Sequence, residues 1–361
     1  KIMVSITEKT LQDLQFPTVL NTVSELCNTE LGAEKALLIK PFHGKEALMS
    51  SLLMTSEYAS SFVNNNAIPN HGFEQLSAEL KFLAIEDSYL DTPSFKKISN
   101  LSETVNVLLS FFKKFYDYYP ELKKFSDNVP LTTELIVEIG KVVDKYGEIK
   151  DNASPQLVDL RREMNSVRGK VNQSFGTALT QYNSLGYLDD IKESFVQNRR
   201  VLAVLSMYRR KVKGSILGSS KTGSIAYIEP EATLKYSREL ANLEYEEGEE
   251  VKRILKKLSA IIRPHVALIM QYQEYLSDID VLAAKAKYAR KINGILPDIT
   301  ENRIVNFRDA YHPILYLTNK EKKEITYPQS INFSDEKRII VISGPNAGGK
   351  TISLKTVGLL Q

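Results

Sequence analysis

A stripe of apolar and aromatic side chains constrains the fold of this chain more than any other feature. Between residues 251 and 286 these side chains recur in alternating steps of three and four: Val251, Ile254, Leu258, Ile261, His265, Leu268, Tyr272, Tyr275, Ile279, Leu282 and Ala286. Such a heptad pattern is typical of a long helix that packs along a partner. Pro264 falls within the stripe. Because a proline removes a backbone donor, we expect a kink or break near Ile261.

A second stripe begins after Pro155 and predicts the partner helix. It comprises Leu157, Leu160, Met164, Val167, Val171, Ala178 and Tyr182. A helix of thirty residues from Pro155 would extend about 45 Å. The two stripes therefore predict two helical arms, one leaving a body and one returning to it.

Residues 1–150 show helical spacing in shorter runs and predict that body. One run consists of Leu11, Leu14, Val19, Val23 and Leu26. His43 and His71 lie in polar, turn-like stretches of this region. We expect both to be exposed loop residues, because no second metal ligand stands at a suitable spacing from either.

Composition excludes several classes of protein. No window approaches the run of about 18 apolar residues that spans a membrane, and the first residues lack the apolar core of a signal peptide. Cys27 is the only cysteine, so a disulfide within the chain and a cysteine metal cluster are both excluded. We expect a cytoplasmic protein with no membrane partner. The net charge of +3 is small, so the distribution of charge is more informative than its sum.

Between the two arms, helical spacing gives way to alternation. Apolar residues occupy every second position at Val201, Ala203, Leu205 and Met207, and later at Ile225 and Tyr227. Gly214, Gly218 and Gly223 supply turn positions. We expect a small β-element at the tip of a helical arm. Pro230 suits the first turn of the returning helix.

The basic charge of this region is concentrated in the β-element. From residue 194 to 228 there is no acidic residue but seven basic ones: Arg199, Arg200, Arg209, Arg210, Lys211, Lys213 and Lys221. The returning arm carries the opposite sign in EYEEGEE at 244–250. A basic tip favours a polyanion backbone, because each neutralised phosphate releases counterions. Serines and glycines at 218–224 add donors for phosphate oxygens. The alternative is a solvated hairpin whose charges only keep the protein soluble.

The segment RIIVISGPNAGGKTISLKTVGLL at 338–360 contains a complete phosphate-binding motif. An apolar run at 339–342 predicts the strand before the loop, and helical spacing follows it, as the motif requires. The loop residues expected to wrap phosphate groups are Gly344, Pro345, Asn346, Ala347, Gly348 and Gly349. Lys350 is expected to reach the β- and γ-phosphates of ATP, and the Thr351 hydroxyl to join the Mg²⁺ shell. These last two are the predicted catalytic residues.

Only ten residues follow the motif. Hydrolysis also needs a carboxylate at the end of another strand, and in such proteins that strand lies well downstream of the loop. We therefore expect the chain to be the N-terminal piece of a longer protein, and we expect this piece not to hydrolyse ATP.

The order of these parts resembles the MutS family. GPNAGGKT at 344–351 looks like that family's form of the loop, in which Pro-Asn follows the first glycine. AYHP at 310–313 is similar to its Arg-His-Pro stretch, with Tyr311 in place of the arginine and His312 expected to be a structural hydrogen-bonding residue. GSSKTGSIAYIEPEA at 218–232 and AAKAKYARKING at 283–294 resemble the bacterial branch often called MutS-two.

This resemblance implies a mainly α fold. It implies a helical core with long antiparallel helical lever arms and a small β clamp at their tip, followed by part of an α/β P-loop ATPase of the ABC type. The expected boundaries are 1–154 for the core, 155–193 for the outgoing lever helix, 194–230 for the basic β clamp, 231–263 for the returning lever helix, 264–297 for the return to the core and 298–361 for the incomplete ATPase segment.

The resemblance also implies an ATP-controlled clamp that holds double-stranded or branched DNA, suppresses homologous recombination and works as a homodimer when full length. Mismatch recognition is not expected, because none of the fourteen phenylalanines has a glutamate two residues on, as the family's wedge does. The family's adenine-stacking position falls in 324–331, where we expect Tyr327 to be the platform. In the longer protein the resemblance implies an ATPase and, in many members, a C-terminal nuclease domain.

Two other functions compete with the DNA clamp. The same branch is associated with rescue of collided ribosomes, in which the basic tip would grip ribosomal RNA. The sequence does not discriminate between the two, since both ligands are polyanions with regular backbones. A chromosome-organising ATPase with a coiled-coil arm is disfavoured, because its phosphate loop should precede the coiled coil.

Overall fold

The computed structural model describes residues 6–345 and 349–361, and these are mainly helical with two small antiparallel sheets. The mainly α fold class is therefore confirmed. The chain divides into two compact units, which are treated separately: Lys1–Leu80, Lys97–Ile136 and His265–Gln361 form the first, and Lys81–Lys96 with Val137–Pro264 form the second.

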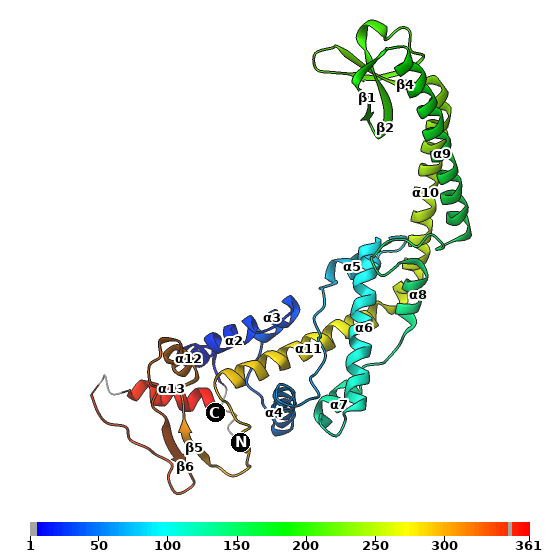
Figure 1. Ribbon diagram of the computed structural model, residues 1–361. Coiled ribbons are helices and arrows are strands. Elements are labelled where there is room, and N and C mark those ends of the chain that lie inside the picture. Colours follow the sequence, from blue (N-terminus) through cyan, green and yellow to red (C-terminus); the bar gives the residue numbers. More distant parts are fainter. Residues whose placement is uncertain (1–5, 346–348) are drawn as a thin grey trace. The chain divides into compact units, whose positions relative to one another are not determined.

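The first unit is built around helix α11 (Val266–Lys291), which packs against α2, α3 and α4 (Figure 1). Its other elements are short. The helices are α1 (Glu8–Asp13), α2 (Phe16–Glu25), α3 (Glu30–Leu37), α4 (Lys45–Ser60), α7 (Pro120–Ser126), α12 (Pro313–Lys322) and α13 (Lys350–Leu360), and the strands are β5 (Val305–Ala310) and β6 (Gln329–Phe333). Helices α5 (Ser77–Leu83), α6 (Thr92–Lys114) and α8 (Glu134–Val142) cross the division between the units.

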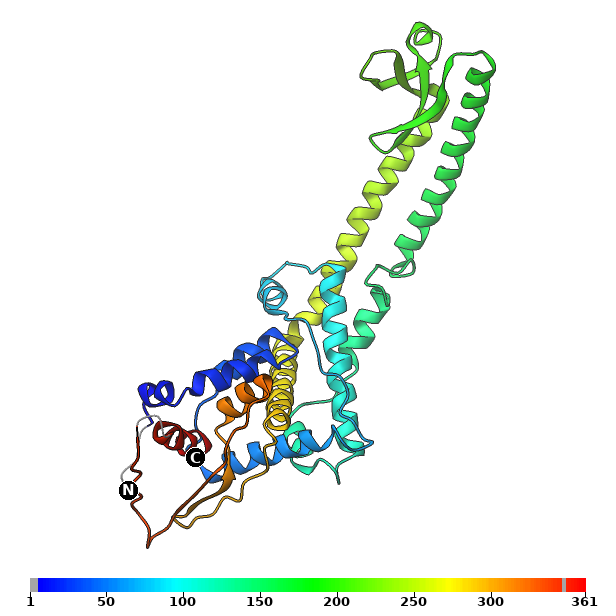
Figure 2. The same ribbon diagram turned by 60° about the vertical axis from the view of Figure 1, so that its left-hand side comes forward.

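The second unit contains two long helices, α9 (Pro155–Ser184) and α10 (Glu231–Ile262), which lie side by side (Figures 1 and 2). The predicted stripe on α9 is buried, because Leu160, Met164 and Val167 pack against Leu243 of α10. Ser154 caps α9, accepting the Leu157 N–H at 3.1 Å. The expected pair of helices is therefore present, but α9 packs against Leu243, which precedes the predicted stripe that begins at Val251.

Helix α9 ends earlier than the predicted outgoing helix of 155–193. Gly186, with φ of 69°, lies just past its end, and the Tyr187 N–H donates to the Tyr182 carbonyl at 3.1 Å. This six-to-one bond is a helix-ending motif that favours glycine in the left-handed region. The residues from Leu188 then form strand β1 (Leu188–Val196), so the β-element begins before residue 194.

The expected break at Pro264 is confirmed. Helix α10 ends at Ile262, a 3₁₀ turn η2 (Arg263–His265) follows, and α11 begins at Val266. Next to the turn the buried positions differ by one residue from the predicted stripe, whereas Tyr272, Tyr275 and Ile279 further along are buried as predicted. Ile262 and Ile269 are fully buried, whereas Ile261 is 36% exposed.

A four-stranded antiparallel sheet lies at the end of the helix pair, with strand order β1-β2-β4-β3. The other strands are β2 (Arg199–Leu205), β3 (Gly214–Ser219) and β4 (Ile225–Pro230), and η1 (Ser206–Tyr208) follows β2. The predicted alternation is wrong in β2, since all four residues from 201 to 204 are buried. The expected strand position of Met207 is also wrong, because this residue lies in η1.

Close packing at the start of β3 explains one glycine. A Cβ atom on Gly214 would lie 2.1 Å from the Glu229 carbonyl oxygen, so no other residue fits beside β4.

No helix in the described ranges has the length and apolar character of a membrane span.

Candidate nucleic-acid interface and phosphate loop

Two of the seven basic residues at the tip are engaged by acidic partners. Arg199 Nη1 lies 3.1 Å from Oε2 of the buried Glu229. Arg200 Nη2 lies 2.6 Å from Glu193 Oε2, and its guanidinium stands over the Phe175 ring, 4.4 Å from the centroid. Both glutamates sit just outside the segment 194–228 that lacks acidic residues. These two arginines therefore join strands and helix within the tip, and less of their charge is left for an outside ligand.

The loop between β2 and β3, residues 206–213, carries most of the remaining positive charge, and we call it the cationic loop. Arg209, Arg210, Lys211 and Lys213 are all exposed. None of these four forms an ion pair within the part of the chain that the structure describes. Val212 points inward and joins the buried cluster under the sheet. The loop is thus held from inside and presents cations outward.

Hydrogen bonds and aromatic stacking fix the conformation of the cationic loop. The Ser206 N–H donates to the Ser224 carbonyl at 2.9 Å. Tyr208 stacks on Tyr187 with 4.6 Å between ring centroids, and Lys211 Nζ lies 5.5 Å from the Tyr208 centroid. A ligand that binds such a prearranged loop forfeits little conformational entropy.

Three hydroxyl groups gather in the neighbouring turn at 220–224. The Thr222 and Ser224 oxygens are 2.8 Å apart, and Ser220 Oγ lies 3.3 Å from Thr222 Oγ1. Lys221 is exposed within the same turn. Since Ser206 binds this turn to the cationic loop, hydroxyl donors and cations form one continuous polar surface.

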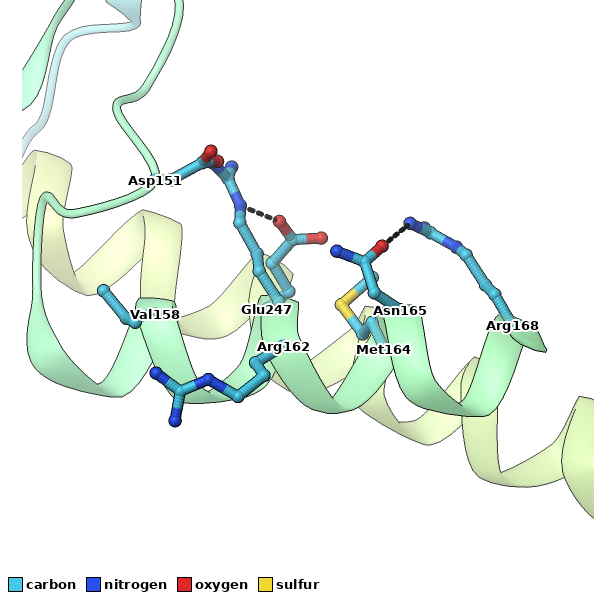
Figure 3. A pocket seen from close by; sticks show the side chains of 8 residues that line it. Asp151, Val158, Arg162, Met164, Asn165, Arg168 and Glu247 are labelled. Atoms are coloured by element: carbon cyan, nitrogen blue, oxygen red, sulfur yellow. Dashed lines mark hydrogen bonds and ion pairs between the residues drawn. The ribbon is translucent and has the colours of Figure 1, made fainter. Parts of the chain in front are cut away.

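The acidic segment 244–250 neutralises arginines on the facing helix. A groove between α9 and α10 is lined by Arg161, Arg162 and Arg168 together with Asp151 and Glu247 (Figure 3). Arg161 forms ion pairs with Asp151 and, at 2.7 Å, with Glu247. Arg162 pairs with Asp159 and Arg168 with Glu244. Among the described residues, every arginine of this groove therefore has an acidic neighbour, unlike the cations of the cationic loop.

The predicted phosphate loop lies at the start of helix α13 in the first unit. Gly349 has φ of 81° and occupies the N-cap position, and no described side chain caps the helix. Lys350 Nζ donates to the Gly344 carbonyl oxygen, which holds the ammonium group across the loop. A Cβ atom at Gly344 or Gly349 would meet no atom within 4 Å, so the space around both is open. Thr351 is exposed.

Asn346, Ala347 and Gly348 of the predicted loop lie outside the described residues. Pro345 follows Gly344 in an exposed stretch. No side chain in the described ranges caps the N–H groups at the start of α13. Such groups and a lysine ammonium are suited to a phosphate group.

The predicted strand before the loop is wrong. Residues 339–342 form no strand and pair with none of the described strands. Their exposures of 84%, 43%, 85% and 47% alternate with the period of two that a strand would have. The nearest sheet in sequence is the antiparallel pair β5–β6. A strand requires hydrogen-bonding neighbours, and the described residues supply none here.

Tyr327 lies just before β6 and is 78% exposed. Its ring is available for stacking. His312 is buried and caps α12, accepting the Leu315 N–H through Nδ1 at 3.3 Å. Burial lowers the pKa of His312, and Lys355 lowers it further. The expectation of a structural hydrogen-bonding role for His312 is confirmed.

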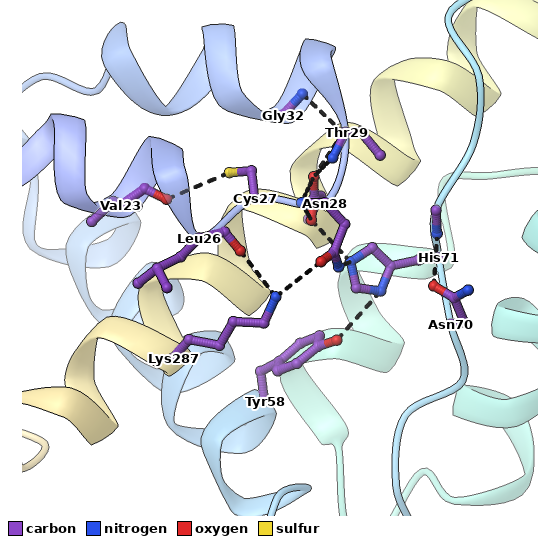
Figure 4. A network of polar contacts seen from close by, with 12 residues as sticks. Val23, Leu26, Cys27, Asn28, Thr29, Gly32, Tyr58, Asn70, His71 and Lys287 are labelled. Carbon is purple, nitrogen blue, oxygen red and sulfur yellow. Dashed lines mark hydrogen bonds and ion pairs between the residues drawn. The ribbon is translucent and has the colours of Figure 1, made fainter.

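A buried polar network in the first unit was missed by sequence reasoning (Figure 4). Asp280 on α11 is fully buried and accepts hydrogen bonds from the Asn28 N–H at 2.9 Å, the Thr29 N–H at 2.9 Å and the Thr29 hydroxyl at 2.6 Å. His71 Nε2 lies 3.2 Å from the same carboxylate, and Tyr58 Oη lies 3.3 Å from His71 Nδ1. The prediction that His71 is exposed is therefore wrong, whereas His43 is exposed as expected.

The hydrogen bonds decide the ionisation of this network. Burial alone raises the pKa of Asp280, but the bonds from His71, Thr29 and Asn28 outweigh burial and bring it below its ordinary value. Burial raises the pKa of the neighbouring Cys27 thiol to about 12, and the Asp280 charge adds to this. The carboxylate is therefore charged at neutral pH, and the thiol is protonated and unreactive.

Nearly the whole chain is similar to proteins named Endonuclease MutS2. No family model matches the chain. Endonuclease MutS2 of Caldanaerobacter subterraneus subsp. tengcongensis is 31% identical over 99% of this chain, and the match covers 44% of that protein. The proteins of the same name from Alkaliphilus oremlandii and Staphylococcus aureus strain Newman are each 27% identical over 98% of the chain, with 44% and 45% of their lengths covered. Nearly the whole chain is thus similar to these three proteins, but it spans less than half of the length of each.

Proposed function

We propose that this chain binds nucleic-acid backbones through the cationic loop, as part of a structure-selective DNA clamp of the MutS-two type. The observation that carries the proposal is the group of four exposed basic side chains at 209–213 on a fixed loop, without acidic partners among the described residues. Contacts of this kind neutralise phosphates and release counterions. They position a nucleic acid without reading its sequence.

The same proposal assigns ATP to the phosphate loop. The uncapped start of α13 supports this assignment, as does Lys350, whose ammonium group is held across the loop. Lys350 would hold the β- and γ-phosphates, the Thr351 hydroxyl would join the Mg²⁺ shell, and Tyr327 would stack on the adenine. Bound ATP would bring the phosphate charge that Lys350 and Mg²⁺ would neutralise.

The relatives are named endonucleases, and more than half of their length lies outside the match. We assign backbone binding to the residues of this chain, and we do not assign DNA cleavage, a complete ATPase site or homodimer formation to them.

Salt-dependent binding tests the proposed interface. The variant has alanine at Arg209, Arg210 and Lys211, and its affinity for a labelled four-way junction is measured by anisotropy across a range of salt concentrations. Loss of three phosphate contacts should reduce the slope of log K against log salt by about 2.7 for duplex arms, at about 0.9 per contact. Affinity should fall for all sequences alike.

The matched control removes the same charge from another part of the second unit. Lys252, Lys256 and Lys257 on α10 are replaced by alanine, which should leave the slope unchanged. An equal loss of slope in both variants would indicate a general charge effect and overturn the assignment to the loop. In a third measurement, ribosomes are used in place of the junction at the same salt concentration. Binding to ribosomes but not to junctions would identify ribosomal RNA, and not DNA, as the ligand of the loop.

A further inference from the structure

An exposed apolar side chain projects from the cationic loop. Met207 is 76% exposed and lies in the 3₁₀ turn η1. Both of its neighbours in sequence are fixed. Ser206 is hydrogen-bonded to the Ser224 carbonyl, and Tyr208 is stacked on Tyr187 at 4.6 Å. The turn therefore holds Met207 outward on a stiff support.

The surroundings of Met207 point to the chemistry of its partner. Arg209 and Arg210 follow within three residues and are exposed, and no acidic residue occurs between 194 and 228. An apolar side chain among unpaired cations complements a ligand with a negative surface and an apolar interior. Duplex nucleic acid has this composition, with phosphates outside and stacked bases inside.

We propose that Met207 is a wedge that enters between neighbouring bases while Arg209 and Arg210 hold the adjacent phosphates. Apolar side chains on DNA-bending proteins act in this way, and insertion requires partial unstacking. Unstacking costs free energy in a continuous duplex and little at a branch point, where stacking is already interrupted. The wedge thus gives the loop a preference for branched over continuous duplex, which backbone contacts alone do not supply. This inference rests on the proposed function of the loop.

The chain contains no tryptophan, which permits a direct test. Met207→Trp introduces a single fluorophore, excited at the red edge where tyrosine does not absorb. Stacking on a base should quench its emission when a four-way junction is added, and more strongly than when a continuous duplex of the same sequence is added. Ile191→Trp is the matched control, because Ile191 is 71% exposed on β1 of the same sheet but lies beside Asp189 and Asp190. Its emission should not change.

Affinity measurements separate the wedge from the charge. Met207→Ala should lower the junction-to-duplex affinity ratio about tenfold while leaving the salt slope unchanged, and Met207→Leu should preserve the ratio. An unchanged ratio in Met207→Ala, or unquenched Met207→Trp at saturating junction, would overturn the wedge while leaving backbone binding intact. Quenching by polyglutamate instead of DNA would assign Met207 to an acidic peptide. If the unaltered chain binds neither junction nor duplex, the proposed function fails and the wedge fails with it.

Discussion

Replacing Gly32 with alanine should destabilise the first unit, although the same change normally stabilises a helix. Gly32 lies in α3, where alanine offers up to about 1 kcal/mol over glycine. A Cβ atom at this position would lie 2.4 Å from Asp280 Oδ2 and 2.8 Å from Thr29 Oγ1. The carboxylate cannot move away freely, because the Asn28 and Thr29 N–H groups hold it.

The magnitude follows from these opposing terms. Overpacking a rigid interior costs about 1–3 kcal/mol, and each hydrogen bond stretched at a buried carboxylate adds about 1–3 kcal/mol. After the helical gain is subtracted, Gly32→Ala should lower the free energy of unfolding by about 1–5 kcal/mol. Gly169→Ala on α9 is the matched control, since Gly169 is exposed and its Cβ would meet no atom within 4 Å. That change should stabilise by about 0.5–1 kcal/mol.

Amide hydrogen exchange is the suitable assay, because it reports the stability of separate regions and does not require the two units to unfold together. Peptides from α3 and α11 should lose protection in Gly32→Ala, and peptides from α9 should gain protection in Gly169→Ala. If Gly32→Ala increased protection as Gly169→Ala does, the packing of α3 against Asp280 would be wrong.

Three further predictions follow from the same structure. Folding lowers the pKa of Asp280, so its ionised carboxylate stabilises the folded chain. This stabilisation is fully present above the unfolded pKa of about 3.9 and is lost as pH falls through the lower folded pKa. The free energy of unfolding of Asp280→Asn, measured by urea denaturation, should therefore match that of the unaltered chain only at acid pH. Lys350→Ala should abolish ATP binding in calorimetric titration without changing the helical circular dichroism signal, and retained binding would remove Lys350 from the site. Arg199→Ala should destabilise the tip by about 1–3 kcal/mol, since it leaves the buried Glu229 carboxylate without its cation. Hydrogen-exchange protection of β2 and β4 measures this loss. The salt dependence of junction binding should change less in Arg199→Ala than in Arg209→Ala.

The elements that could be predicted from the sequence are those whose signal is periodic and local. The stripe on α9 fixed which face would be buried, and Pro264 fixed where α10 would end, because both depend on residues close together in the chain. The exposed cations at 209–213 were also identified from the sequence alone. In each case the physical cause lies within a few helical turns or one loop.

The remaining features depend on residues far apart in sequence. His71 lies in a polar stretch whose composition is typical of a surface loop. It is nevertheless buried, with its Nε2 3.2 Å from the Asp280 carboxylate. From the sequence, Arg199 was expected to be available to a ligand, because its partner Glu229 lies thirty residues further along the chain. Residues 339–342 have the composition of a strand, but the sequence cannot state which neighbours will pair with it. In these three cases a residue distant in sequence, or the lack of a pairing strand among the described residues, determines the outcome. The early end of α9 is instead a local effect of Gly186.

The polar ties between α9 and α10 have a mechanical consequence for the second unit. Ser154 Oγ lies 2.5 Å from Glu250 Oε1 and Arg161 Nε lies 2.7 Å from Glu247 Oε1, while Ser174 is tied to Thr233 nearer the sheet. Sliding one helix past the other by a single turn, about 5.4 Å, would break all three ties at once and separate the packed apolar stripes. The two helices therefore resist sliding along their common axis, and a displacement or rotation at one end of the pair is transmitted to the other end as a rigid-body motion.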